Sequence, residues 1–169
     1  MTEQDRTRTQ RLGDIVGRWN TTGHVLTNPP IPVVGTDTYE WLPGQHFLVH
    51  HVDVHVGDQH VQAIEIIGEH DPDSDTYLTR SYDSDGNADV MRLEIDRDGA
   101  FHFAGGPNIA PAARAGDAPA GGAVRSTLTV AGDRHTMVAL WERADDGTTW
   151  EPWMDIHLTL AEPDRHPQS

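Results

Sequence analysis

Two titratable residues in strongly alternating segments could carry acid-base chemistry. His51 lies within the segment 47–56, and Glu65 lies between apolar neighbours in the segment 59–69. An imidazole and a carboxylate that are buried together in apolar surroundings can take pKa values near neutrality, which suits proton transfer. We therefore treat His51 and Glu65 as candidate catalytic residues of a cyclase or isomerase.

Further polar and aromatic side chains on neighbouring segments could orient a bound molecule. A charge inside an apolar run needs a partner, and large aromatic rings supply apolar contact area. The candidate ligand-binding residues are Asp53, Arg80, Tyr82, Arg92, Trp141, Trp153 and His157. Among them, Arg80 and Arg92 could supply the counter-charges for the carboxylates.

Nucleophilic and metal chemistry have less support in the sequence. The chain has no cysteine and no Gly-x-Ser-x-Gly motif, so we do not expect a hydrolase. His51, Asp53 and His55 would project to one side of a strand, where two of them could hold an ion together with a third ligand such as His157. The histidine spacing of cupins is not reproduced after Gly44, however, and chance adjacency explains the pattern better in a chain with eleven histidines. We assign no metal site.

The segments that must position these residues read as strands. Apolar residues recur at every second position in short segments between residues 17 and 162, and Asp- and Gly-rich turns separate these segments. We predict strands at 18–26, 36–42, 47–56, 59–69, 76–83, 89–96, 100–104, 123–130, 134–143 and 150–160. A meander of about ten strands must hide its two outer strands, so we predict an all-β fold with a single closed antiparallel barrel.

The rest of the chain is assigned around this barrel. We expect a short helix over 7–15 that could plug one end, a proline-rich loop over 27–34 and a long loop over 105–122 that is either a lid or disordered. Residues 1–10 and 163–169 are expected to be flexible tails of one domain that spans 1–169. A barrel of ten strands should leave an interior cavity.

The strand faces that line this cavity are not decided by the pattern alone. In the segment 47–56 we expect His51 and Asp53 to face inward together with Glu65, because polar groups among apolar ones suit a ligand cavity, whereas the other face suits a filled core. The two faces of that segment are Phe47, Val49, His51, Asp53 and His55, and Leu48, His50, Val52, Val54 and Val56. The two faces of the last strand are Trp150, Pro152, Met154, Ile156 and Leu158, and Glu151, Trp153, Asp155, His157 and Thr159.

The segment Gly17-Arg18-Trp19, after a short helix-like stretch, resembles the opening signature of lipocalins and the wider calycin group. Similarity continues to a bacterial group of calycin-like domains without assigned function. The segments that carry it are Tyr39-Glu40-Trp41, Phe47 to Asp53, Ile64 to Gly68 and Tyr82 to Gly86. The resemblance implies a ligand-binding barrel with a Trp packed across its base.

The Gly-x-Trp and His157 on the last strand are also similar to the nitrobindin-like haem proteins, whose glycine-rich sequence after the Trp is replaced here by Asn20-Thr21-Thr22. That resemblance implies haem ligation by His157. We expect no cofactor, with haem as the alternative.

Composition narrows the partners. A net charge of −15 should repel nucleic acid and anionic lipid surfaces, and no apolar run approaches membrane-spanning length. The absence of cysteine and of a signal peptide favours the cytoplasm. We therefore expect a monomer or homodimer that binds a small, largely apolar molecule, with the cyclase or isomerase as the alternative.

Overall fold

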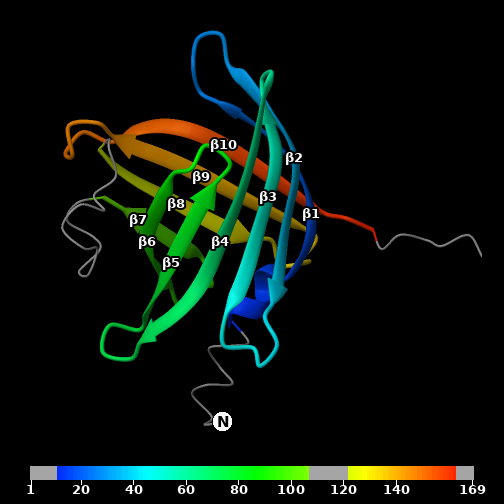
Figure 1. Cartoon of the computed structure of the whole chain (residues 1–169), viewed down its shortest axis with the longest axis vertical. Coiled ribbons are helices and arrows are strands. Elements are labelled where there is room, and N and C mark those ends of the chain that lie inside the picture. Colours follow the sequence, from blue (N-terminus) through cyan, green and yellow to red (C-terminus); the bar gives the residue numbers. More distant parts are fainter. Residues whose placement is uncertain (1–10, 107–121, 163–169) are drawn as a thin grey trace, which may run out of the picture.

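In the computed structural model, which describes residues 11–106 and 122–162, ten strands form one closed antiparallel barrel (Figure 1). Each strand pairs with its neighbours in sequence, and β1 pairs with β10 to close the sheet. The strands are β1 (Gly17–Val25), β2 (Ile31–Trp41), β3 (Leu48–Val56), β4 (Gln59–Asp71), β5 (Thr76–Asp83), β6 (Ala88–Ile95), β7 (Phe101–Gly105), β8 (Ala123–Val130), β9 (Thr136–Ala144) and β10 (Glu151–Leu160). The predicted fold class is confirmed.

One predicted boundary is wrong, because residues 31–34 belong to β2 rather than to the proline-rich loop. The Pro32 carbonyl accepts a hydrogen bond from the backbone N–H of Gly57, just beyond the end of β3. The backbone nitrogen and the carbonyl of Pro32 point to the same side of β2, toward the chain just beyond the end of β3. No residue within β3 therefore needs an N–H group from Pro32 as a hydrogen-bond donor. The strand can therefore include a proline.

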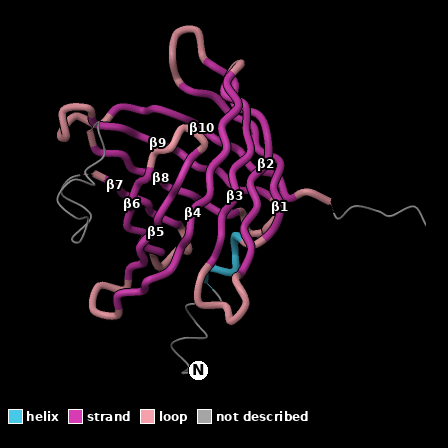
Figure 2. The backbone as a smooth tube through the Cα atoms, viewed as in Figure 1, coloured by secondary structure: helices cyan, strands magenta, loops and turns pink. Residues whose placement is uncertain are grey.

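The expected N-terminal helix is a single 3-10 turn in the described residues, η1 (Gly13–Ile15) (Figure 2). It does plug one end of the barrel, since Leu12 and Ile15 are buried in the core. Trp19 is 1% exposed, and its indole Nε1 donates a hydrogen bond of 2.9 Å to the carbonyl of Ile15. This contact ties the turn to the first strand.

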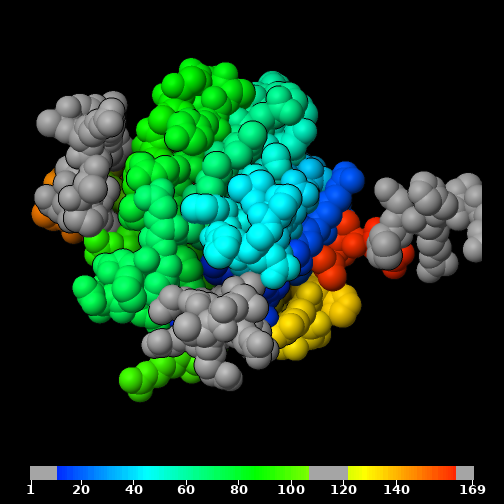
Figure 3. Space-filling view, turned by 60° about the horizontal axis from the view of Figure 1, so that its bottom comes forward, coloured from blue at the N-terminus to red at the C-terminus, as the bar shows by residue number. Residues whose placement is uncertain are grey.

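The end of the barrel that contains this turn is filled by side chains. Trp19, Phe101, Leu48, Ile67 and Leu93 are all less than 2% exposed and belong to one core cluster. Figure 3 turns this end forward and shows the loop between β2 and β3 (cyan) and the turn between β8 and β9 (yellow) around it. The core therefore closes one end of the barrel.

Three predicted features lie outside the described residues. They are the tail 1–10, the tail 163–169 and residues 107–121 of the predicted long loop. Within residues 11–106 and 122–162, no helix has the length and apolarity needed to cross a membrane.

Candidate functional site

A cavity of about 390 Å³ occupies the barrel above the filled end. Most of its wall is apolar, and Val54, Met91, Leu128 and Ile156 are among the side chains that form it. Val25, at the end of β1 away from Trp19, also lines the cavity and is only partly buried. A filled base and a largely apolar interior are typical of small-molecule sites.

Four polar side chains on four successive strands lie together in the cavity wall. These residues, which we call the polar row, are Thr21 of β1, Asp37 of β2, His50 of β3 and Glu65 of β4. His50 and Glu65 lie directly opposite each other in the ladder between β3 and β4. Thr21, Asp37 and Glu65 are all less than 9% exposed, so the row is taken out of water.

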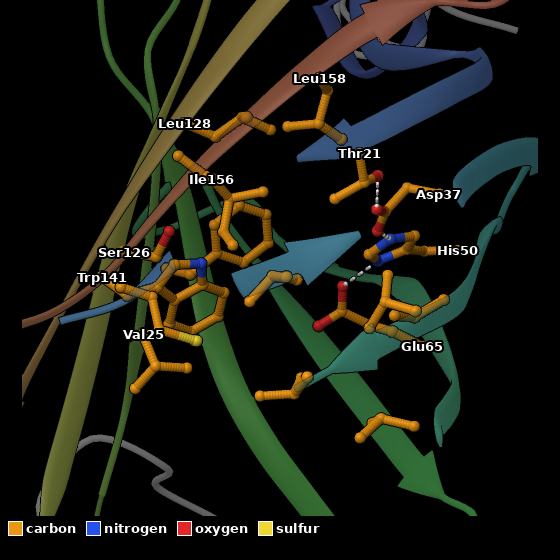
Figure 4. Close-up of a pocket in the computed structure, with 18 of the residues that line it drawn as sticks. Thr21, Val25, Asp37, His50, Glu65, Ser126, Leu128, Trp141, Ile156 and Leu158 are labelled. Carbon is orange, nitrogen blue, oxygen red and sulfur yellow. Dashed lines mark hydrogen bonds and ion pairs between the residues drawn. The ribbon is translucent and has the colours of Figure 1, made fainter. Parts of the chain in front are cut away.

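The polar row is connected by hydrogen bonds (Figure 4). The imidazole Nε2 of His50 lies 2.6 Å from Asp37 Oδ1, and its Nδ1 lies 3.3 Å from Glu65 Oε1. The Thr21 hydroxyl donates to Asp37 Oδ2. When both carboxylates are ionised, both imidazole nitrogens serve as donors and His50 is the imidazolium.

The protonation of His50 follows from these contacts. Burial alone would lower the pKa of His50, but the hydrogen bonds and the charges of Asp37 and Glu65 outweigh burial and raise the pKa to about 9. The ring of Tyr39 stacks on the imidazole with centroids 3.9 Å apart. Burial, together with the nearby charges of Asp37 and Glu65, raises the pKa of Tyr39 well above its ordinary value.

The opposite wall of the cavity contains two tryptophans. Trp141 and Ser126 face the polar row across the cavity (Figure 4). Trp141 meets Trp153 edge to face, with ring centroids 6.3 Å apart. Both predicted tryptophans thus line the cavity. Trp153 and Met154 are consecutive in β10 and yet both line the cavity, because the register of β10 shifts between Pro152 and Met154.

The prediction that Glu65 faces the cavity is confirmed, but the same prediction for His51 and Asp53 is wrong. The inward face of β3 is the more apolar one, with His50, Val52, Val54 and Val56 in the cavity wall. Because side chains alternate along a strand, His51 and Asp53 must then point outward. Their side chains are 45% and 56% exposed.

On the outer surface these two residues have partners of their own. His51 lies 3.3 Å from Glu40, and Asp53 lies 2.7 Å from His60, which holds the pKa of Asp53 below its usual value. Tyr82, 53% exposed, joins His51 and Asp53 along a groove on the outer face of β3, β4 and β5. The structure therefore brings these three predicted residues together, but outside the cavity.

Three further predicted residues also lie outside the cavity. Arg80 pairs with Glu69 at 2.7 Å, with both side chains more than 40% exposed. Arg92 lies between Met91 and Leu93, which face the interior, so Arg92 faces outward. His157 is exposed on β10 between Ile156 and Leu158, both of which line the cavity. The expected placement of His157 inside the barrel is thus wrong, and we do not carry haem ligation through this residue further.

The sequence interpretation missed Asp37, His50, Thr21 and Ser126. Asp37 stands in a polar stretch, Thr36-Asp37-Thr38, without the apolar neighbours that singled out Glu65. The alternation of the strand could have identified Asp37, because Asp37 lies on the same strand face as Val33 and Tyr39, and this face lines the cavity. Among the described residues, no group of three or more His, Asp, Glu or Cys side chains is arranged to hold a metal ion.

Comparison with known proteins supports the fold and gives no information on function. No family model and no curated protein sequence matches the chain. The crystal structure of Rv2717c from M. tuberculosis is similar over 90% of this chain and 96% of that chain, with a TM-score of 0.62 and 12% sequence identity. The class of protein that fold and site together define is a closed ten-stranded barrel with an interior cavity.

Proposed function

We propose that this protein binds a small, largely apolar molecule inside its barrel. The observation that carries the proposal is the cavity of about 390 Å³, whose mostly apolar wall holds one hydrogen-bonded polar row. Apolar walls provide affinity and a few placed polar groups provide orientation. The cavity lies inside a sheet without free edges, on a filled base that gives it a rigid floor.

We also propose that the barrel is calycin-like. Trp19 packs at the closed end and is fixed to the preceding turn through Ile15, which supports the role that the Gly-x-Trp resemblance implies for this residue.

The binding proposal can be tested with N-phenylnaphthylamine, a neutral fluorophore that brightens in apolar surroundings. The wild-type protein should bind it with saturable fluorescence enhancement. Ala139 lines the cavity on β9, so Ala139→Phe should fill the space and weaken binding at least tenfold. Leu140→Phe is the matched control because Leu140 is the next residue, is 55% exposed and lies on the outer face.

The outcome is decided by comparing these two variants. If Ala139→Phe lowers thermal stability, Val54→Phe fills the same cavity from β3 and provides a second test. Equal binding by wild type, Ala139→Phe and Val54→Phe would place the fluorophore elsewhere and reject the proposal. Loss of binding in Leu140→Phe as well would show that the effect is not specific to the cavity.

A second candidate function is proton transfer on the bound molecule, with Glu65 paired to His50 in place of His51. One observation favours it: Oε1 of Glu65 contacts His50, while its other oxygen has no hydrogen-bond partner in the described part of the chain. A ligand recovered from the purified protein would be incubated with it in heavy water. Catalysis predicts deuterium incorporation that Glu65→Gln abolishes at ligand concentrations that saturate the variant, and no incorporation by wild type would reject it.

A further inference from the structure

The cavity carries an excess of negative charge that its own residues do not neutralise. Asp37 and Glu65 contribute two carboxylates and His50 one imidazolium, which leaves a formal charge of −1. Among the described residues that line the cavity, none is Lys or Arg. Arg80 of β5 pairs with Glu69 on the outer surface. Arg125 of β8 pairs with Glu142, also on the outer surface.

One acceptor in this row is free. Glu65 is 8% exposed, and its Oε1 contacts His50 Nδ1 at 3.3 Å. The second carboxylate oxygen of Glu65 points away from His50 into the cavity (Figure 4) and has no hydrogen-bond partner in residues 11–106 and 122–162. Because this oxygen is open to the cavity, a donor group on a ligand can reach it and form a charge-assisted hydrogen bond.

The remaining polar atoms of the row are already engaged. Both imidazole nitrogens of His50 have carboxylate partners, and Asp37 accepts from both His50 and Thr21. A ligand carboxylate or phosphate would therefore find no free donor in the row and would meet its net negative charge. The row selects against anions and offers one site for a donor.

Aromatic rings in the wall reinforce this preference. Trp141 and Phe103 line the cavity together with Tyr39. The faces of such rings attract cations and repel anions, most strongly where water is excluded. Trp141 faces the side of the cavity that holds His50 and Glu65 (Figure 4).

We propose that the bound molecule carries a protonated amine on an apolar body, with the ammonium group donating a hydrogen bond to the free oxygen of Glu65. This inference rests on the proposed binding function and names its ligand class. The apolar wall holds the body of the molecule, and the buried carboxylate holds its cationic end. A charge-assisted hydrogen bond of this kind is among the strongest that a protein site can offer.

The test uses octylamine, octanol and octanoate, which share one chain and differ in charge at pH 7. Titration calorimetry of the wild-type protein should give octylamine an affinity at least tenfold above octanol, with octanoate weakest. Glu65→Gln should reduce the preference for octylamine over octanol to less than threefold. Glu40→Gln is the matched control, because Glu40 is 63% exposed on the outer face of β2 and should leave the preference intact.

A second variant provides the test if Glu65→Gln does not fold. Asp37→Asn removes one negative charge from the row without touching Glu65, so it should also lower the preference for octylamine. If N-phenylnaphthylamine binds but octylamine binds no better than octanol or octanoate, the inference is overturned and the binding function stands. A preference for octylamine that persists in both variants also overturns it. If neither the fluorophore nor any octyl compound binds, the binding function itself fails.

Discussion

His50 and Glu65 face each other directly across the ladder between β3 and β4, with 3.3 Å between the imidazole Nδ1 and the carboxylate Oε1. On its other side His50 lies 2.6 Å from Asp37 of β2. One imidazolium therefore links three neighbouring strands inside the barrel. Because all three side chains are about nine-tenths buried, solvent screens their interaction weakly.

The first prediction concerns stability at alkaline pH. The folded protein raises the pKa of His50 from 6.5 to about 9, so folding favours the protonated form. The resulting stabilisation is complete below pH 6.5, declines as the pH rises, and is lost above about pH 9. Its upper bound is about 3 kcal/mol, from the difference between the two pKa values. Urea unfolding at pH 6 and at pH 9.5 measures it.

Two variants of adjacent histidines provide the comparison for this pH dependence. His50→Gln removes the titrating group and should flatten the decline, although it also lowers stability because two buried carboxylates lose their cation. His51→Gln, on the exposed face of the same strand, should lose stability with rising pH as the wild-type protein does. A decline that survives in His50→Gln would show that another group is responsible.

The second prediction concerns the end of the polar row. Thr21→Val keeps the size of the side chain but removes the hydroxyl that donates to Asp37. We expect a loss of about 1–3 kcal/mol in the free energy of unfolding, because a buried carboxylate loses a donor. Thr22→Val is the control, since Thr22 is exposed on the outer face of β1. Equal effects of the two substitutions in urea titrations would contradict a specific role for Thr21.

The strand pattern could be predicted from the sequence because alternation is a local property. Every strand except β2 begins and ends within two residues of its predicted position. The start of β2 was missed because prolines normally interrupt a ladder, whereas Pro32 lies where no ladder donor is required. Whether a proline is tolerated depends on where the neighbouring strand ends, which a local pattern does not show.

The inward face of β3 was harder to predict, because histidine occurs at both positions 50 and 51. The sequence interpretation expected a polar cavity and therefore favoured the face with His51 and Asp53. The cavity wall is instead mostly apolar, and its charged residues lie together in the polar row. Asp37 and Glu65 lie 28 positions apart, so their common imidazole partner depends on the register of three strands. That register is a tertiary property.

The third prediction concerns the closed end of the barrel. Trp19→Phe removes the indole N–H that donates to the carbonyl of Ile15 and leaves that buried acceptor unpaired. We expect a loss of about 2–3 kcal/mol from the unmade hydrogen bond and the smaller ring. Trp150→Phe, at a partly exposed ring beside Arg125, should cost less. Similar losses for both variants in urea titrations would mean that Trp19 does not anchor the turn.

The last prediction concerns Gly35, which lies on the inward face of β2 two residues before Asp37. A Cβ added at Gly35 would lie 2.2 Å from the carbonyl oxygen of Asp53 and 2.5 Å from the Cα of Val54, both in the backbone of β3. Glycine in a strand interior marks such a close approach of two backbones. The missing side chain therefore lets β2 and β3 come together where Asp37 must reach His50.

We expect Gly35→Ala to force these strands apart, to cost more than about 3 kcal/mol and to disturb the contact between Asp37 and His50. The imidazole proton signals of His50, followed by NMR, should shift together with the loss of stability in urea titrations. Gly132→Ala is the matched control, because a Cβ at Gly132 would meet no atom within 4 Å and its φ is not positive. A Gly35→Ala protein that is as stable as Gly132→Ala would show that β2 and β3 can separate without cost, and that the glycine does not position Asp37.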